Sequence, residues 1–130
     1  VEEDLMHYAR IDLCIVGGIT EALKIARWCE AHYINLAPHN PLGPVSTAAG
    51  LHLCLASPNV GVLELPTKPG TSLPDVFPVQ ATWEDGYLLP PSLPGLGLEF
   101  DEEAARTHPH LELTAPEVAL RRKDGSLTNW

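Results

Sequence analysis

Hydrophobic residues in the first half of the chain gather in three short runs, at residues 11–16, 34–37 and 60–65. Each run is bounded by glycine or proline, and short apolar runs with such boundaries are typical of buried β-strands. The third run is apolar on both sides of Gly61, as expected for a strand that is buried on both faces. The pattern therefore predicts three strands within the first 65 residues.

Two segments between these runs carry apolar residues at helical spacing. The first helix is expected to run from an N-cap at Thr20 to about His32, and the second to cover about 45–56 with Pro44 in its first turn. Strands that alternate with helices pair in parallel, so the sequence predicts an α/β fold built from βαβ units. The apolar positions are Ile19, Ala22, Leu23, Ala26 and Cys29 in the first helix, and Val45, Ala48, Ala49, Leu51 and Leu55 in the second.

A polar residue lies near an end of each predicted strand. Asp12 and His39 are 27 positions apart, and His39 and Glu64 are 25 positions apart. A (β/α)8 barrel averages about 31 residues per unit, and a Rossmann-type sheet fits these intervals almost as well. The first strand is followed by Gly17-Gly18, which lacks the G-x-G-x-x-G pattern of a dinucleotide site. A (β/α)-barrel and a Rossmann-type sheet therefore both stay open for these three parallel strands and their helices, and the missing glycine pattern weighs against a nucleotide-binding Rossmann site.

The composition changes at Pro66. Seven prolines and four glycines fall within residues 66–97, and this density excludes a long helix because proline fixes φ and donates no backbone hydrogen bond. The segment is nevertheless too apolar for a solvated linker. We divide the chain into barrel strands and helices at 1–65 and a Pro-rich arm with a C-terminal capping segment at 66–130.

The overall composition narrows the class of partner. The chain has 130 residues, is 45% hydrophobic, and carries a formal charge of −9, which argues against a nucleic-acid or anionic-membrane surface. No apolar run approaches the roughly 18 residues of a membrane span, and the first residues lack the pattern of a signal peptide. Three cysteines without a CxxC pair favour reduced thiols and a cytoplasmic location.

The three polar residues suggest acid–base chemistry, because the loops after parallel strands build the active site in such folds. A carboxylate beside a histidine fixes the imidazole tautomer and stabilises the imidazolium, so Asp12 and His39 would make a general base. Glu64 would donate a hydrogen bond to a substrate oxygen if its surroundings kept it protonated. The structural alternatives are a histidine that only packs, a turn-capping Asp12 and a surface Glu64.

Local sequence favours the catalytic alternative. The stretches RIDLCIVGGITEALKIA, APHNPLGPVSTAA and VGVLELP, followed by PGLGLEFDEEAA and RRKDGSLTNW, resemble the C-terminal barrel part of the mandelate racemase/muconate lactonizing enzyme branch of the enolase superfamily. The resemblance is greatest to acid-sugar dehydratases of the galactonate type. It implies that His39 and Asp12 form the general base dyad, that Glu64 stabilises an enediolate, and that water is eliminated after loss of the proton α to a carboxylate.

The same resemblance implies partners outside these residues. The cofactor would be Mg²⁺, with its ligands upstream of Val1, so no residue of this chain is expected to bind the metal. The substrate would be a sugar acid, and the full-length enzyme a homo-oligomer that binds neither nucleic acid nor membrane. The isolated chain is expected to be inactive. The alternatives are a racemase, epimerase or cycloisomerase of the same superfamily, or an inactive truncated chain that acts at most as an interaction module.

Overall fold

Two short strands form the centre of the fold and run parallel to each other. A computed structural model describes residues 1–110 and 120–128; in it β1 (Tyr8–Ala9) pairs with β2 (Asn35–Leu36), with Tyr8 opposite Asn35. An isolated parallel bridge between Asp12 and His39 continues this pairing beyond the strands. The three-strand α/β arrangement was predicted, but the described strands do not close into a barrel.

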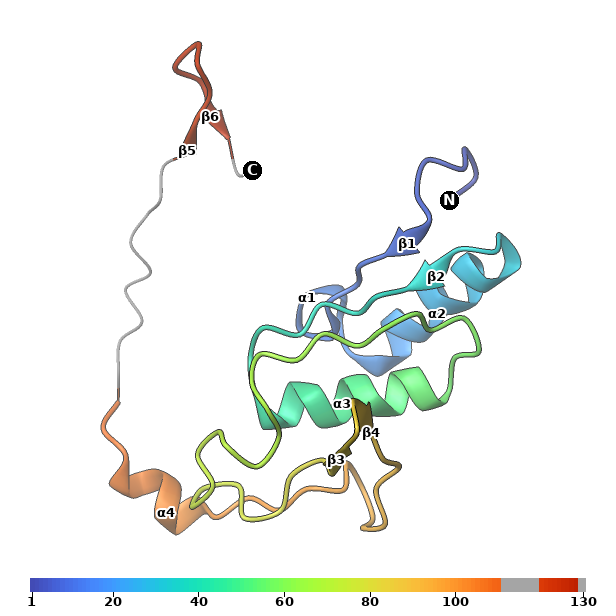
Figure 1. The fold of residues 1–130 in the computed structure, drawn as a ribbon. Coiled ribbons are helices and arrows are strands. Elements are labelled where there is room, and N and C mark those ends of the chain that lie inside the picture. The colour runs from blue at the N-terminus through green and yellow to red at the C-terminus, as the bar shows by residue number, and fades with distance from the viewer. Residues whose placement is uncertain (111–119, 129–130) are drawn as a thin grey trace.

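The helices α2 (Ile19–Ala31) and α3 (Pro44–Leu55) supply the cover for one face of this sheet (Figure 1). Side chains alternate between the two faces of a strand, so Ala9 and Leu36 are buried against the helices while Tyr8 and Asn35 are exposed. The hydrophobic core consists of Ala9, Ile11, Leu13, Ala22, Ala26, Cys29, Ile34, Leu36 and Leu53. The exposed polar side chains of these strands therefore lie on the face opposite the helices.

The predicted strand at 11–16 is wrong, because residues Leu13–Val16 form the short helix α1. Asp12 caps this helix: its Oδ1 accepts a hydrogen bond from the Cys14 N–H at 2.8 Å. Gly17 ends it in the left-handed conformation, with φ of 105°. The local caps outweigh the strand preference of the β-branched residues. The strand itself lies a few residues earlier in the chain, at β1.

The third predicted strand, at 60–65, forms only in part. A single parallel bridge joins Val60 to Leu36, and the Glu64 N–H donates to the Pro38 carbonyl at 3.3 Å, so the segment follows β2 without a regular ladder. Gly61 is required by its surroundings, since a Cβ atom there would lie 2.7 Å from Cε1 of Tyr8 and 3.3 Å from the Leu36 carbonyl oxygen. The segment nevertheless brings Glu64 beside the residues that follow β2.

The two long helices lie where the apolar spacing placed them. The N-cap of α2 is Gly18 rather than Thr20, whereas its C-cap is His32, close to the predicted end. Pro44 occupies the first turn of α3, and the Ser46 hydroxyl accepts a hydrogen bond from the Gly43 N–H at 3.0 Å. Pro44 and the hydrogen bond between Gly43 and Ser46 thus fix the start of α3, five residues after His39.

No helix lies within residues 66–97, in agreement with their proline content. They contain the antiparallel hairpin of β3 (Trp83–Glu84) and β4 (Tyr87–Leu88), which lies next to α3 (Figure 1). The helix α4 (Glu102–Thr107) and a second hairpin, β5 (Leu120–Arg121) and β6 (Leu127–Thr128), follow. The division at 66 into an arm and a capping segment stays a prediction, and part of the latter lies outside the described residues.

Cys14, Cys29 and Cys54 are all free thiols. Among the described helices, none has both the length and the apolar composition needed to cross a membrane.

Candidate functional site

Asp12 is positioned by the backbone on both sides of it. The bridge to His39 holds the Asp12 backbone in the sheet, and its Oδ1 atom is used to cap α1. The other carboxylate oxygen, Oδ2, lies 2.9 Å from Nδ1 of His39. One buried carboxylate therefore stabilises a helix start and orients a histidine at the same time.

His39 is held on its backbone by a hydrogen bond of 2.8 Å from its N–H to the Ile11 carbonyl. Its imidazole is one-third exposed. When Nδ1 donates its proton to Asp12, the lone pair of the neutral ring lies on Nε2. That atom faces the third segment, where Oε2 of Glu64 lies 3.8 Å away. The Asp12 carboxylate thus lies on one ring nitrogen of His39, and the other ring nitrogen lies near the third segment.

Glu64, the third residue of the predicted trio, is held by hydrogen bonds from Arg10 and Asn40. Nη2 of Arg10 donates to both of its carboxylate oxygens, at 2.8 and 2.9 Å, and the Asn40 N–H donates to Oε2 at 3.1 Å. The hydrogen bonds from Arg10 and then from Asn40 lower the pKa of Glu64, with smaller contributions from the charges of Arg10 and His39. These surroundings favour the carboxylate over the protonated acid, because they stabilise the charged form.

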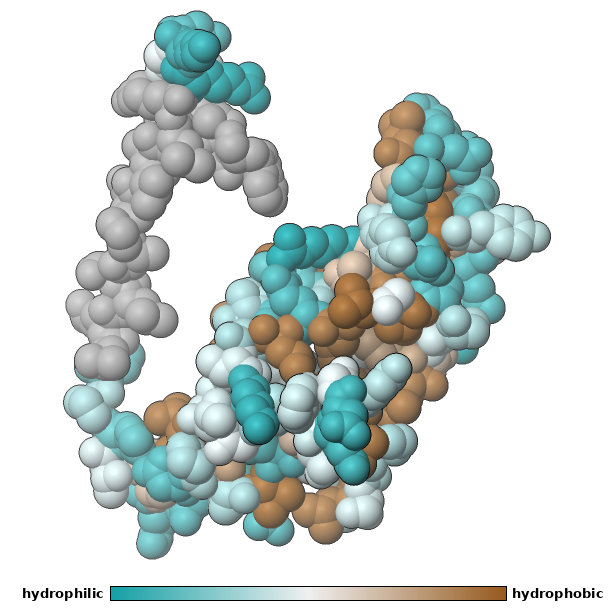
Figure 2. Space-filling view, viewed as in Figure 1, coloured by the Kyte–Doolittle hydropathy of each residue, from teal (hydrophilic) through white to brown (hydrophobic). Residues whose placement is uncertain are grey.

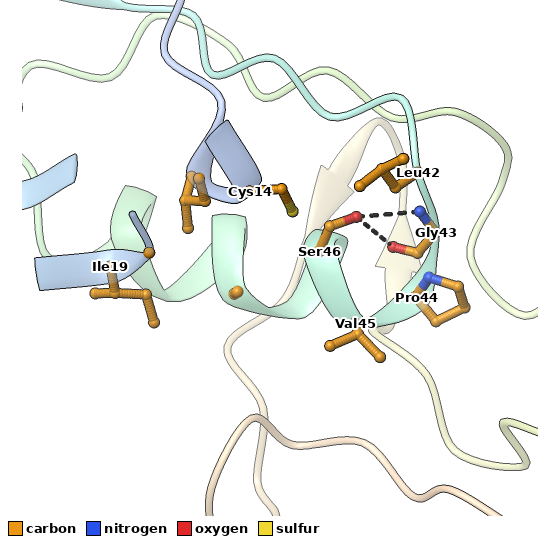
Figure 3. Close-up of a pocket in the computed structure, with 10 residues that line it drawn as sticks. Cys14, Ile19, Leu42, Gly43, Pro44, Val45 and Ser46 are labelled. Atoms are coloured by element: carbon orange, nitrogen blue, oxygen red, sulfur yellow. Dashed lines mark hydrogen bonds between the residues drawn. The ribbon is translucent and has the colours of Figure 1, made fainter. Parts of the chain in front are cut away.

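The dyad lines an open cavity of about 360 Å³. Arg10, Asp12 and His39 form its polar wall, and Ile11, Ile15 and Val16 form its apolar wall. A second cavity, of about 340 Å³, lies between α1 and the start of α3 and is almost entirely apolar (Figure 3). Figure 2 shows hydrophobic residues exposed over the middle of the molecule in this view. The chemistry-bearing residues belong to the first cavity.

Arg10 and Asn40 are site residues that the sequence analysis missed. Arg10 precedes Asp12 by two positions, so the period of a strand places both on the same face, and this spacing was a usable signal. Asn40 directly follows His39, and its position within PHNPLGP was the signal available there. The partner of each, Glu64, is distant in the chain, which local patterns do not reveal.

The residues present do not by themselves form a magnesium site. Within 1–110 and 120–128, no group of three or more His, Cys, Asp or Glu side chains is placed to hold a metal ion. The oxygens of Asp12 and Glu64 are already bonded to Cys14, His39, Arg10 and Asn40. The origin of the metal ligands stays a prediction from the family resemblance.

The chain is similar in sequence to known dehydratases. The chain is 40% identical, over 92% of its length, to a D-galactonate dehydratase of Ralstonia nicotianae. It is 37% identical, over its full length, to a D-mannonate dehydratase of Caulobacter vibrioides. The alignments cover 33% and 32% of these relatives, so the chain spans about a third of the length of the curated relatives it matches.

Solved structures agree with these relatives. An enolase from Pantoea ananatis with bound D-gluconate and Mg superposes with a TM-score of 0.75 and 34% identity, over 84% of this chain and 26% of that one. A putative galactarate dehydratase from Agrobacterium radiobacter, with bound Na and L-malate, superposes with a TM-score of 0.77 and 32% sequence identity. The match covers 93% of this chain and 34% of that one. Residues 1–104 match the family described as enolase C-terminal domain-like. With four-fifths of its residues in that match, the chain belongs to this family, in the mandelate racemase/muconate lactonizing enzyme branch of the enolase superfamily.

Proposed function

We propose that this chain supplies the general base of an acid-sugar dehydratase, which removes the proton α to the carboxylate of a sugar acid and then eliminates water. The observation that carries the proposal is the contact of 2.9 Å between Asp12 Oδ2 and His39 Nδ1 at the wall of an open cavity. The dehydratase names of two relatives, each at least 37% identical, support the choice of reaction.

His39 is the base in this proposal. Nε2 takes the α proton, and the electron pair of the broken C–H bond moves into the carboxylate to give an enediolate. The enediolate expels the β-hydroxyl, which takes a proton from an acid supplied by the rest of the complete enzyme and leaves as water. The enol that remains tautomerises to a keto acid, and the His39 imidazolium returns its proton to solvent. Asp12 keeps Nδ1 protonated before the transfer and stabilises the imidazolium after it.

Glu64 and Arg10 have electrostatic roles. Arg10 places a cation at the same cavity as His39, where it offsets part of the charge that develops on the substrate carboxylate. Glu64 lies beside Nε2 as a carboxylate, so in this arrangement it accepts hydrogen bonds rather than donating one. Donation to an enediolate oxygen would require Glu64 to exchange its bonds with Arg10 for a proton.

Magnesium remains part of the proposal as a cofactor of the complete enzyme. A solved relative contains Mg together with D-gluconate. The ligands would come from residues other than those described here, since the carboxylates near His39 are engaged by donors. Self-association of the complete enzyme and its cytoplasmic location stay predictions from the family resemblance.

The test uses a chimera in which this chain replaces the matching region of the Ralstonia nicotianae D-galactonate dehydratase. The chimera is incubated in D₂O with the sugar acids named in its relatives, D-galactonate and D-mannonate, and with D-gluconate. We expect keto-acid formation and deuterium exchange at the α carbon, both followed by NMR. Epimerised acid without keto acid would instead indicate a racemase or epimerase.

The matched variants are His39→Asn and His32→Asn in that chimera. His32 lies at the end of α2 and contacts Glu2 at 3.4 Å rather than the dyad. We expect His39→Asn to abolish exchange and His32→Asn to leave it near the parent rate. Exchange that survives His39→Asn would remove this histidine as the base.

A further inference from the structure

Asn40 is an uncharged polar residue that is almost completely buried, with 3% of its surface exposed, directly after the proposed base. Its Nδ2 donates to Thr47 Oγ1 at 2.8 Å and to the Glu64 carbonyl at 3.1 Å. Its Oδ1 accepts from Ser46 Oγ at 2.6 Å. Burying an amide is costly unless its hydrogen bonds are satisfied, and here both ends of the amide are bonded.

These bonds connect the three pieces of chain that make the site. Ser46 and Thr47 belong to the first turn of α3, where the Ser46 hydroxyl is also bonded to the backbone of Gly43 (Figure 3). Glu64 belongs to the segment beside β2. The first turn of α3 is thereby connected, through the Asn40 side chain, to the residue that follows the proposed base and to the backbone of Glu64.

The backbone of Asn40 also takes part. Its N–H donates to Glu64 Oε2 at 3.1 Å, and the same oxygen lies 3.8 Å from His39 Nε2. Because the peptide that carries this N–H is the one that joins His39 to Asn40, a rotation of Asn40 would move the donor and the imidazole together. The side-chain bonds prevent that rotation.

We infer that Asn40 is a positioning residue: anchored on Ser46 and Thr47, it holds the Glu64 carboxylate at a set place beside the His39 imidazole. The juxtaposition itself needs no assumption about the reaction, whereas its catalytic meaning rests on the proposed function. The charged groups that face this pair are Arg10 on Glu64 and Asp12 on His39.

Asn59 provides a matched control. It too is an asparagine between strand and helix, with Nδ2 donating to the carbonyls of Ile34 at 2.9 Å and Ala26 at 3.3 Å. Its hydrogen bonds involve no site residue. A purely structural asparagine is expected to behave like Asn59, whereas a positioning residue also affects the ionisation of Glu64.

The experiment compares Asn40→Ala and Asn59→Ala in the 130-residue chain, with the carboxyl group of Glu64 titrated by NMR and the ring signals of His39 recorded at neutral pH. We expect both variants to lower the Tm. In Asn40→Ala alone, the pKa of Glu64 should rise towards its ordinary value, and the ring signals of His39 should shift at neutral pH. Equal titrations in Asn40→Ala, Asn59→Ala and the parent chain would overturn the inference.

Thr47→Val is a gentler second variant in case Asn40→Ala does not fold. It keeps the shape of a buried side chain and removes the acceptor of one Asn40 bond. We expect the same directions of change in Glu64 and His39, at smaller size, and no change would count against Asn40. None of these measurements needs turnover, so failure of the chimera would refute the proposed reaction and leave the positioning result to be judged separately.

Discussion

Arg10 and Glu64 are 54 positions apart, yet one guanidinium nitrogen of Arg10 donates to both carboxylate oxygens of Glu64, at 2.8 and 2.9 Å. The pair joins the residue that follows β1 to the end of the segment 60–65. Arg10 lines the same cavity as Asp12 and His39. Oε2 of Glu64 lies 3.8 Å from Nε2 of His39. The residue that follows β1 thus lowers the pKa of a carboxyl group in the segment on the other side of β2.

Arg10→Gln is expected to raise the pKa of Glu64 towards its ordinary value, because the hydrogen bond from Arg10 is the largest cause of the lowered pKa. A lowered carboxyl pKa stabilises the fold at pH values above the pKa of the unfolded chain, and that stability is lost as the pH falls through the folded-state pKa. The variant should therefore lose stability at neutral pH and show a shallower decline on acidification. Titration of the Glu64 carboxyl carbon by ¹³C NMR and thermal unfolding at several pH values measure both effects.

Arg27→Gln is the control for this change. Arg27 forms an exposed ion pair of 3.2 Å with Glu30 on α2. The Glu64 titration should be unaltered in this variant. A Glu64 carboxyl that titrates identically in Arg10→Gln and in the parent chain would contradict the prediction.

Gly61→Ala is expected to destabilise the chain by about 1–3 kcal/mol, the usual cost of overpacking. The added Cβ would lie 2.7 Å from the ring of Tyr8 and 3.3 Å from a backbone oxygen of Leu36. Tyr8→Ala should recover part of the loss in the double variant, because only the ring contact is relieved. Gly43→Ala, with nothing within 4 Å of its Cβ position, should cost less. Urea unfolding of the four variants tests these differences.

The alternation of apolar runs and helical spacing was sufficient to predict the parallel arrangement and both long helices. It was also sufficient to bring Asp12, His39 and Glu64 to one edge, since residues at the ends of parallel strands meet there. The prediction of a strand at 11–16 was wrong because it considered only the strand preference of the β-branched residues. The caps at Asp12 and Gly17 stabilise a helical turn there instead.

Local spacing could have marked Arg10 and Asn40 as candidates, but it could not have revealed their partner. Their roles depend on Glu64, whose distance from them in the chain is bridged only by folding. The protonation of Glu64 was a condition of its predicted role, and the surroundings that lower its pKa, Arg10 first, are contacts that the sequence does not display. Ionisation is set by such contacts rather than by residue type.

Cys14 is expected to react with iodoacetamide much faster than Cys54. Burial raises the pKa of Cys54 from its ordinary 9.0 to about 11, so its thiolate fraction near neutral pH falls about 100-fold. Burial also raises the pKa of Cys29, whereas Cys14 is exposed. Mass spectrometry of peptides after timed labelling at pH 8 gives the rates. Labelling in urea should make the three rates similar, and equal rates in the native chain would contradict the prediction.

Asp75→Asn is expected to loosen the end of α4. Nε2 of His108, the C-cap of this helix, lies 2.7 Å from Oδ2 of Asp75, and this hydrogen bond is the main cause of the lowered pKa of Asp75. The stabilisation is present above the ordinary Asp pKa of 3.8 and is lost as the pH falls through the lower folded-state value. Hydrogen exchange in α4 should therefore be faster in the variant at pH 6 and should converge with the parent chain in strong acid.

Asp124→Asn is the control for the α4 experiment. The pKa of Asp124 is also lowered, but by hydrogen bonds from Ser126 within a separate turn. Exchange in α4 should not change in this variant. If both substitutions accelerate it equally, a general effect of lost charge would explain the result.

Asp12 allows its two roles to be separated by a pair of substitutions. Asparagine is as good an N-cap as aspartate, so Asp12→Asn should keep the bond from the Cys14 N–H to the side-chain oxygen and most of the stability. It replaces the carboxylate oxygen beside His39 Nδ1 with a neutral amide, so the hydrogen bond that orients the ring is weakened and the NMR signals of the His39 ring should change. Asp12→Ala removes both functions and should cost about 1 kcal/mol more than Asp12→Asn, the usual value of a lost cap. The comparison is made by urea unfolding and by NMR spectra of the His39 ring in the same samples. Ring signals in Asp12→Asn identical to those of the parent chain would show that the carboxylate does not orient the imidazole, and would leave Asp12 as a helix cap alone.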